Sequence, residues 1–219
     1  MTLIYNVDLS STFCIKLAIS KALGIGIVVG GSVMKLPQLL KIINSQSAFG
    51  VPFSTYSLEV WAYLVSTIYA YRSNLPISTY GENVSLTLQN MLITLLIIYY
   101  SPSASLPLSG GSSIRSSSKT LPITLATTVM IVTTAFLLSP ALCSADLLTF
   151  FQGTTIPISL VSKIPQILEL HSNKETGNLS SIVVFAQLLG TIARCFTTAT
   201  ETDDRLLLAG FAGATVFNG

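Results

Sequence analysis

The sequence predicts an all-α integral membrane protein. Half of its 219 residues are hydrophobic, only 9% are charged, and the mean hydropathy is +0.69. Ordinary soluble domains carry roughly 25% charged residues, so this composition cannot coat a water-exposed surface. The net charge of +2 comes without a basic stripe or an aromatic stacking platform, which argues against nucleic acid as a partner.

Seven apolar segments predict seven transmembrane helices. A spanning helix needs about 20 mostly apolar residues, and six segments meet this length while the seventh is shorter. We expect residues 1–16 to precede the helices, residues 101–119 to form a Ser/Pro/Gly-rich linker, and the chain to end inside its last helix, as a fragment would. The segments are Leu17–Ile43, Pro52–Tyr71, Val84–Tyr100, Thr120–Leu138, Cys143–Leu170, Ser181–Thr198 and Leu206–Gly219.

Two of these segments carry the same short motif. Lys35-Leu36-Pro37-Gln38 lies in the first and Lys163-Ile164-Pro165-Gln166 in the fifth. Each motif is followed by a polar loop with a glycine and then by a serine near the start of the next helix. We therefore expect two three-helix repeats, residues 17–100 and 143–219, joined by a linker helix at 120–140. An odd number of helices between the two motifs makes the repeats parallel, about an axis along the membrane normal.

The prolines predict a bent helix in each repeat. Proline has no N–H and its ring clashes with the carbonyl four residues earlier, which frees the carbonyls of Val33 and Val161. A bilayer tolerates such a break only where protein or trapped water satisfies the freed carbonyl. Because the break and a nearby lysine are both duplicated, we expect a polar site between the repeats, with Pro37 and Pro165 shaping it.

Charged residues within the spans identify candidate site residues. Lys35 lies about 12 Å from the end of its helix and Glu59 about 10 Å in from the same membrane face, so an ion pair is expected. The corresponding position for Lys163 holds Gln187 instead of a carboxylate, so an anionic ligand would supply the missing charge. The alternative is that each lysine extends its ammonium group to the lipid headgroups.

Two further features of the helices allow alternative interpretations. Arg194 lies thirteen residues into the sixth segment, where it either reaches headgroups or lines the opposite mouth of the cavity. Gly26 and Gly30, with Gly31 beside them, form a small-residue face that predicts close helix packing. No Ser-His-Asp set, paired carboxylates or metal-ligand spacing is present in the sequence, and we expect no enzyme, cofactor or metal site.

Several stretches together resemble a known superfamily. The paired Pro-Gln motifs in helices one and five are similar to those of PQ-loop proteins, relatives of the SWEET sugar transporters and of cystinosin. Within this superfamily the sequence is most similar to the mannose-P-dolichol utilization defect 1 family. The finer resemblance rests on residues 20–28, 35–38, 47–50, 58–59, 74–78, 81–82, 164–167, 176–180, 193–194 and 201–202.

This resemblance implies a multi-pass protein of the endoplasmic reticulum membrane. It implies a requirement for mannose-P-dolichol and glucose-P-dolichol as lumenal sugar donors in N-glycan and GPI-anchor assembly, with dolichol-dependent glycosyltransferases as partners. In such a lipid-linked sugar, Lys35 and Lys163 would meet the phosphate. The hydroxyls would meet Gln38, Gln166 and Gln187.

Two other functions fit the same residues. One is a small-solute carrier of the SWEET or cystinosin type, for which Glu59 would be the titratable carboxylate in the path. The other is an adaptor that binds the lipid-linked sugar, or supports a transferase, without moving its cargo. All three functions need a polar site between the repeats.

Overall fold

The computed structural model is helical throughout the residues it describes, which are 12–49, 51–100, 120–161 and 181–218. No strand occurs in these ranges. Helices α1 and α2 are two parts of one broken span. Counted together, they and the other described helices agree with the expected series of seven helical segments. The helices are α1 (Thr12–Met34), α2 (Leu36–Ser45), α3 (Phe53–Arg72), α4 (Ile77–Tyr100), α5 (Thr120–Leu138), α6 (Ala145–Val161), α8 (Ser181–Glu201) and α9 (Arg205–Asn218).

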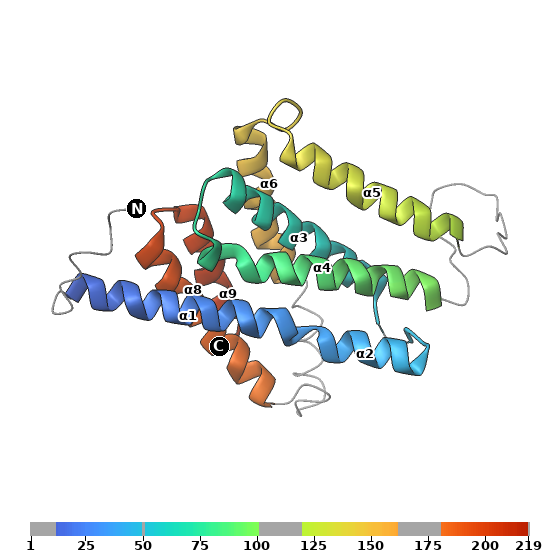
Figure 1. Cartoon of the computed structure of the whole chain (residues 1–219), viewed down its shortest axis with the longest axis horizontal. Coiled ribbons are helices and arrows are strands. Elements are labelled where there is room, and N and C mark those ends of the chain that lie inside the picture. Colours follow the sequence, from blue (N-terminus) through green and yellow to red (C-terminus); the bar gives the residue numbers. More distant parts are fainter. Residues whose placement is uncertain (1–11, 50, 101–119, 162–180, 219) are drawn as a thin grey trace.

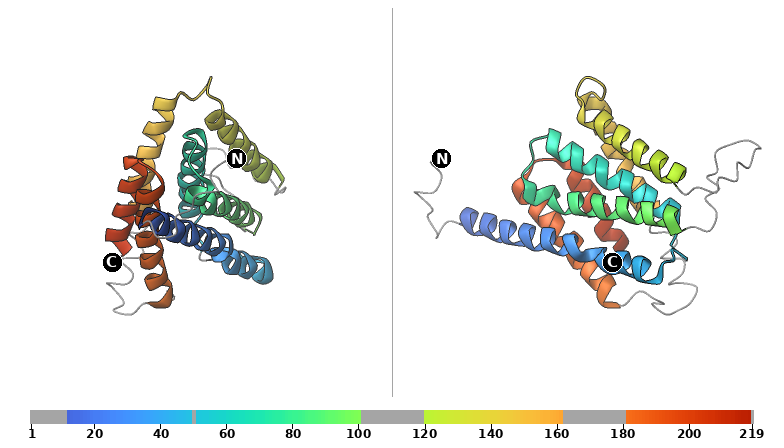
Figure 2. Two further views of the ribbon diagram at one scale, coloured as in Figure 1. Left: turned by 60° about the vertical axis from the view of Figure 1, so that its left-hand side comes forward. Right: turned by 45° about the vertical axis from the view of Figure 1, so that its right-hand side comes forward.

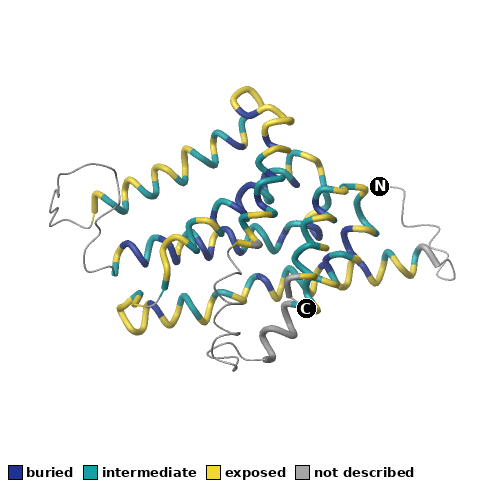
Figure 3. The backbone as a smooth tube through the Cα atoms, turned by 180° about the vertical axis from the view of Figure 1, so that it is seen from behind, coloured by how far each residue is buried: buried dark blue, intermediate teal, exposed yellow. Residues whose placement is uncertain are grey.

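Three of the described helical stretches are long and apolar enough to cross a bilayer by themselves. They are Cys14–Ser45, Ile77–Tyr100 and Thr120–Leu138. The other described helices fall short in length or hydropathy, and two of them, α6 and α8, carry buried polar side chains. Exposed residues, yellow in Figure 3, follow the outer helices, and many of those on α1 and α5 are large and apolar. These properties indicate a multi-pass membrane protein.

The helices pack as two triples with the same internal order (Figures 1 and 2). In the first triple α4 packs against both α1 and α3, and in the second α9 packs against both α6 and α8. The triples meet through α1 against α8 and α3 against α6, with α4 also touching α8. Helix α5 packs on the outside of the first triple, against α3 and α4. The exact boundaries of the repeats, 17–100 and 143–219, stay a prediction.

Helix α4 begins seven residues earlier than the predicted span, at Ile77 instead of Val84. The polar residues at its start suggested a loop, but Ser78, Thr79 and Gly81 are buried there. Asn74 adopts a left-handed backbone conformation (φ 54°) in the turn that reverses the chain after α3. The start of α4 is therefore a polar part of the bundle and not a connection at its surface.

The close packing predicted at the glycines of α1 is correct at Gly31 and wrong at Gly26 and Gly30. A Cβ atom added at Gly26 or Gly30 would meet nothing within 4 Å, so this face is open. The close approach uses Gly24 and Gly31, where an added Cβ would lie 3.1 Å from Ser78 Cβ and 2.8 Å from Glu82 Cβ, respectively. Seven residues are about two turns of helix, so these two glycines share the face that meets α4.

Candidate functional site

The first Pro-Gln motif breaks its helix, as predicted. Helix α1 ends at Met34, α2 begins at Leu36, and Pro37 occupies its first turn, where a missing N–H costs least. Lys35 stands between the two helices with φ −94° and ψ −4°. The break therefore exposes backbone polar groups in the middle of a 32-residue apolar stretch.

Gln89 of α4 satisfies backbone groups around this break. Its Oε1 accepts a hydrogen bond from the backbone N–H of Lys35 at 2.9 Å. Its Nε2 donates to the carbonyl oxygens of Gly31 (3.1 Å) and Ser32 (3.2 Å). Only 7% of Gln89 is exposed, so water cannot substitute for it. Gln89 was not among the predicted site residues, and its signal in the sequence was a pair of adjacent amide side chains, Gln89 and Asn90, within a mainly apolar span.

Lys35 and Glu59 form the predicted ion pair. Lys35 Nζ lies 2.8 Å from Glu59 Oε2, and the side chains are 20% and 22% exposed. The ammonium group also lies 4.9 Å from the centre of the Tyr56 ring, a cation–π distance. Lys35 therefore points into the first triple and does not extend to the headgroups. Because Glu59 neutralises Lys35, an anion at this site would compete with that carboxylate for the ammonium group.

Arg194 of α8 is buried in the interface between the triples. Its Nε donates to Glu82 Oε1 at 2.6 Å, and its Nη1 donates to the Ser78 carbonyl at 2.7 Å, so one side chain ties α8 to α4. The residue is only 2% exposed, which excludes the interpretation in which it reaches headgroups. Burying both charges is tolerable because each is paired and hydrogen-bonded.

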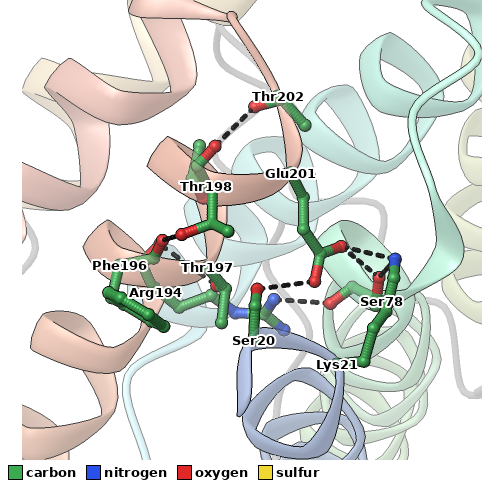
Figure 4. A network of polar contacts seen from close by, with 10 residues as sticks. Ser20, Lys21, Ser78, Arg194, Phe196, Thr197, Thr198, Glu201 and Thr202 are labelled. Atoms are coloured by element: carbon green, nitrogen blue, oxygen red, sulfur yellow. Dashed lines mark hydrogen bonds and ion pairs between the residues drawn. The ribbon is translucent and has the colours of Figure 1, made fainter. Parts of the chain in front are cut away.

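Glu201, the last residue of α8, completes the contact with the first triple (Figure 4). Its Oε1 accepts a hydrogen bond from Ser20 Oγ at 2.7 Å. Its Oε2 accepts from Lys21 Nζ at 2.8 Å and from Ser78 Oγ at 2.5 Å. The carboxylate side chain is 2% exposed while that of Lys21 is 45% exposed, so the cluster lies at one edge of the bundle.

We call this set the interface network: Ser20, Lys21, Ser78, Glu82, Arg194 and Glu201. Its two cations and two carboxylates balance. It joins the starts of α1 and α4 to the second half of α8, and so holds the triples together at the membrane face where α1 begins. Of the six residues in the interface network, only Arg194 was predicted from the sequence as a site residue. The partners lie up to 181 residues apart in the chain, and spacing along one helix cannot reveal them.

Seven buried polar atoms, on six residues, lack a hydrogen-bond partner among the described residues. Both amide atoms of Asn90 are in this state although the residue is 0% exposed. Buried polar atoms are normally paired, and an exception calls for a ligand or a water. The others are Ser57 Oγ, Thr67 Oγ1, Gln152 Oε1, Arg194 Nη2 and Thr198 Oγ1. They are candidates for contacts with a polar ligand.

The other predicted site residues belong to the two Pro-Gln motifs and to α8. Lys163, Pro165 and Gln166 lie outside the described residues, as does the side chain of Gln187, which belongs to α8. The first motif's Gln38 is partly buried. In the described parts of the chain, no three His, Cys, Asp or Glu side chains come together in a way that could hold a metal.

Comparison with known families matches the PQ loop repeat twice, at residues 19–79 and 147–206. The first match covers the Lys35 break and α3, and the second covers the other Pro-Gln motif and most of α8. Together the matches span more than half of the chain. No solved structure gives a significant match. On this evidence the chain belongs to the PQ-loop repeat family.

Proposed function

We propose that this protein binds mannose-P-dolichol and glucose-P-dolichol in the endoplasmic reticulum membrane and presents or translocates them for lumenal glycosylation. Membership of the PQ-loop repeat family indicates a membrane protein with a transport-related function. The finer assignment depends on residues outside the Pro-Gln motifs. Its products would be N-glycans and GPI anchors, and dolichol-dependent glycosyltransferases would be its partners.

The interface network carries this proposal. The finer sequence resemblance rested on short stretches scattered from residue 20 to residue 202. Five of those stretches place Ser20, Ser78, Glu82, Arg194 and Glu201 in one cluster of hydrogen bonds and ion pairs. Residues that resemble one family and also meet in space support a shared working part, because unrelated similarities would scatter over the fold.

The ligand chemistry fits the first triple and the motif residues. A dolichyl-phosphate sugar has an anionic phosphodiester, a polar sugar and a long apolar tail. The phosphate would compete with Glu59 for Lys35, which the 2.8 Å ion pair keeps inside the bundle. Lys163, Gln38, Gln166 and Gln187 complete the proposed set, with Arg194 toward the opposite face.

Opening the proposed site requires the triples to separate at one face. The interface network ties α8 to α1 and α4 there, and the Tyr69 hydroxyl adds a 2.8 Å hydrogen bond to Asp204, which precedes α9. In an alternating-access cycle these contacts would break while the other face closes. An adaptor would bind the lipid-linked sugar with the contacts intact.

A small-solute carrier is the second candidate, and the unpartnered buried atoms favour it. A sugar or an amino acid could form hydrogen bonds with the buried polar atoms of Asn90, Gln152 Oε1 and Arg194 Nη2. A carrier of this kind needs no long apolar surface. The two functions therefore predict different transported molecules.

Rescue of mannosylation in cells that lack the homologue tests the first proposal. Expression of the chain should restore dolichol-dependent mannosylation, measured as mature N-glycans and surface GPI-anchored proteins. Glu201→Gln should reduce rescue because it removes the acceptor charge of the network, whereas the exposed Asp203→Asn should not. Absence of rescue by a correctly inserted, stable protein would reject this function.

Flux measurements separate the candidates. In proteoliposomes, labelled mannose-P-dolichol should change leaflet if the protein is a translocator, and free sugars or amino acids should not cross. Rescue without any flux identifies a presenting factor or adaptor. Fast uptake of a free solute that is lost in Asn90→Leu would establish the carrier instead.

A further inference from the structure

Helix α5 packs tightly only at its C-terminal end. Leu137, near the end of the helix, and Cys143, just beyond it, are both 0% exposed. Arg72 Nη1 donates a hydrogen bond to each of their carbonyl oxygens, at 3.0 and 2.8 Å respectively. Toward its start the helix is much less covered. Leu125 is 45% and Val129 55% exposed. Figure 2 shows α5 along the outer side of the α3–α4 pair.

A crevice of about 290 Å³ lies between this looser half of α5 and the α3–α4 pair. Its walls include Trp61 of α3, Ile98 of α4 and, on α5, Ala126 and Met130. The wall is mainly apolar. One hydroxyl in it, Ser57 Oγ, is buried without a hydrogen-bond partner among the described residues. We call this space the α5 crevice.

The surroundings of the α5 crevice determine what can fill it. Helices α4 and α5 are both long and apolar enough to span the bilayer, and Leu121 (62%) and Val132 (60%) are exposed on α5. The crevice therefore lies at the depth of the hydrocarbon layer. Most of the lining is apolar, and its three hydroxyl groups, those of Ser57, Thr94 and Thr133, are too few to hydrogen-bond water throughout a space of this size. An empty space would forfeit the dispersion contacts of the side chains that line it.

We propose that the α5 crevice is a binding site for one acyl chain of a bilayer phospholipid. An apolar cavity of about 150 Å³ can hold a benzene molecule, so 290 Å³ suits a stretch of one hydrocarbon chain and not a whole lipid. Phospholipid is the bulk solvent of this part of the protein, and no charged side chain lines the crevice to select a headgroup. The chain acts as packing material between α5 and the first triple. This inference does not depend on the proposed function.

Photo-crosslinking in nanodiscs tests the site. Phosphatidylcholine with a diazirine in its acyl chain should label wild-type protein at residues of the crevice, including Trp61 and Ile98, as mapped by peptide mass spectrometry. Ala126→Phe fills the crevice from α5 and should lower labelling of these residues severalfold, because the ring occupies the volume that the acyl chain would take. Ala135→Phe is the matched control, because this alanine is exposed on the same helix and labelling should be unchanged.

Three results would overturn the proposal. Wild-type labelling spread evenly over the exposed faces of α1 and α5 would show ordinary lipid contact and no site; this measurement needs no variant, so it stands if Ala126→Phe does not fold. A polyprenyl phosphate that carries a diazirine provides the second test. If it labels the crevice and excess phosphatidylcholine does not reduce that labelling, the site belongs to an isoprenoid chain. Loss of labelling in Ser57→Ala would indicate a polar ligand, since a hydrocarbon chain gains nothing from an unpaired hydroxyl.

Discussion

The two ends of the broken first span use polar groups for different purposes. Near Lys35, the bonds of Gln89 and Glu59 stay inside the first triple: Gln89 satisfies backbone groups beside the break, and Glu59 pairs with the Lys35 ammonium group. Near Ser20, the bonds of Glu201 join the first triple to the second. The first set preserves the shape of one unit, and the second fixes how two units sit together. A carrier cycle would break only the second set.

Arg194→Met should have the largest effect, because it leaves the Glu82 carboxylate buried without its partner. Losing one member of a buried ion pair costs about 3–5 kcal/mol of folding free energy. The measurement is unfolding by sodium dodecyl sulfate in mixed micelles. The exposed Arg205→Met is the control and should change little. The double variant Arg194→Met/Glu82→Gln should recover much of the loss, and failure to do so would show that the pair is not coupled.

Gln89→Leu should come second, since it removes the side chain that bonds to the broken backbone. Unpaired buried groups cost about 1–3 kcal/mol. Its neighbour provides a sharp contrast, because the Asn90 amide is buried and has no hydrogen-bond partner in the described part of the chain. Asn90→Leu should be neutral or stabilising in the same unfolding assay. Equal losses in both variants would contradict the role given to Gln89.

Lys35→Met should have a smaller effect, about 1–2 kcal/mol, because Glu59 is partly exposed and keeps some access to solvent. The exposed Lys41→Met controls for the loss of a cation nearby. Adding Glu59→Gln should restore stability by removing the unpaired charge. If rescue activity nevertheless stays low in the stable double variant, the pair also serves the ligand, whereas full activity would confine it to a structural role.

Tyr69→Phe should have the smallest effect, about 1 kcal/mol, because it removes one hydrogen bond between the triples. Asp204 keeps its capping bonds to the backbone N–H groups of Leu206 (2.9 Å) and Leu207 (3.1 Å), so α9 should remain intact. Tyr71→Phe, at a 59% exposed tyrosine, is the control. Thermal unfolding in detergent should distinguish them, and identical curves would mean that the Tyr69 bond is not stabilising.

Local rules explain which parts of the site could be anticipated. The Lys35–Glu59 pair could be anticipated from the rise per residue in two consecutive helices, which places both side chains at a similar depth, and the packing then turns them toward each other. The break at Lys35 follows from the missing N–H of Pro37. The Gly26–Gly30 face failed because small residues at helical spacing occur on both faces of α1, and only the position of α4 selects Gly24 and Gly31.

The sequence by itself determined the solvent and the elements: a chain with few charges that must live in lipid, the helices it forms there, and the break beside Pro37. Only the tertiary structure decided which polar groups meet. Glu82, Arg194 and Glu201 come from helices whose rotation and neighbours are set by the packing of the whole bundle. Within a bilayer the driving force for burial of apolar groups is weak, so such packing and polar contacts choose the arrangement, and no short stretch of sequence contains both partners.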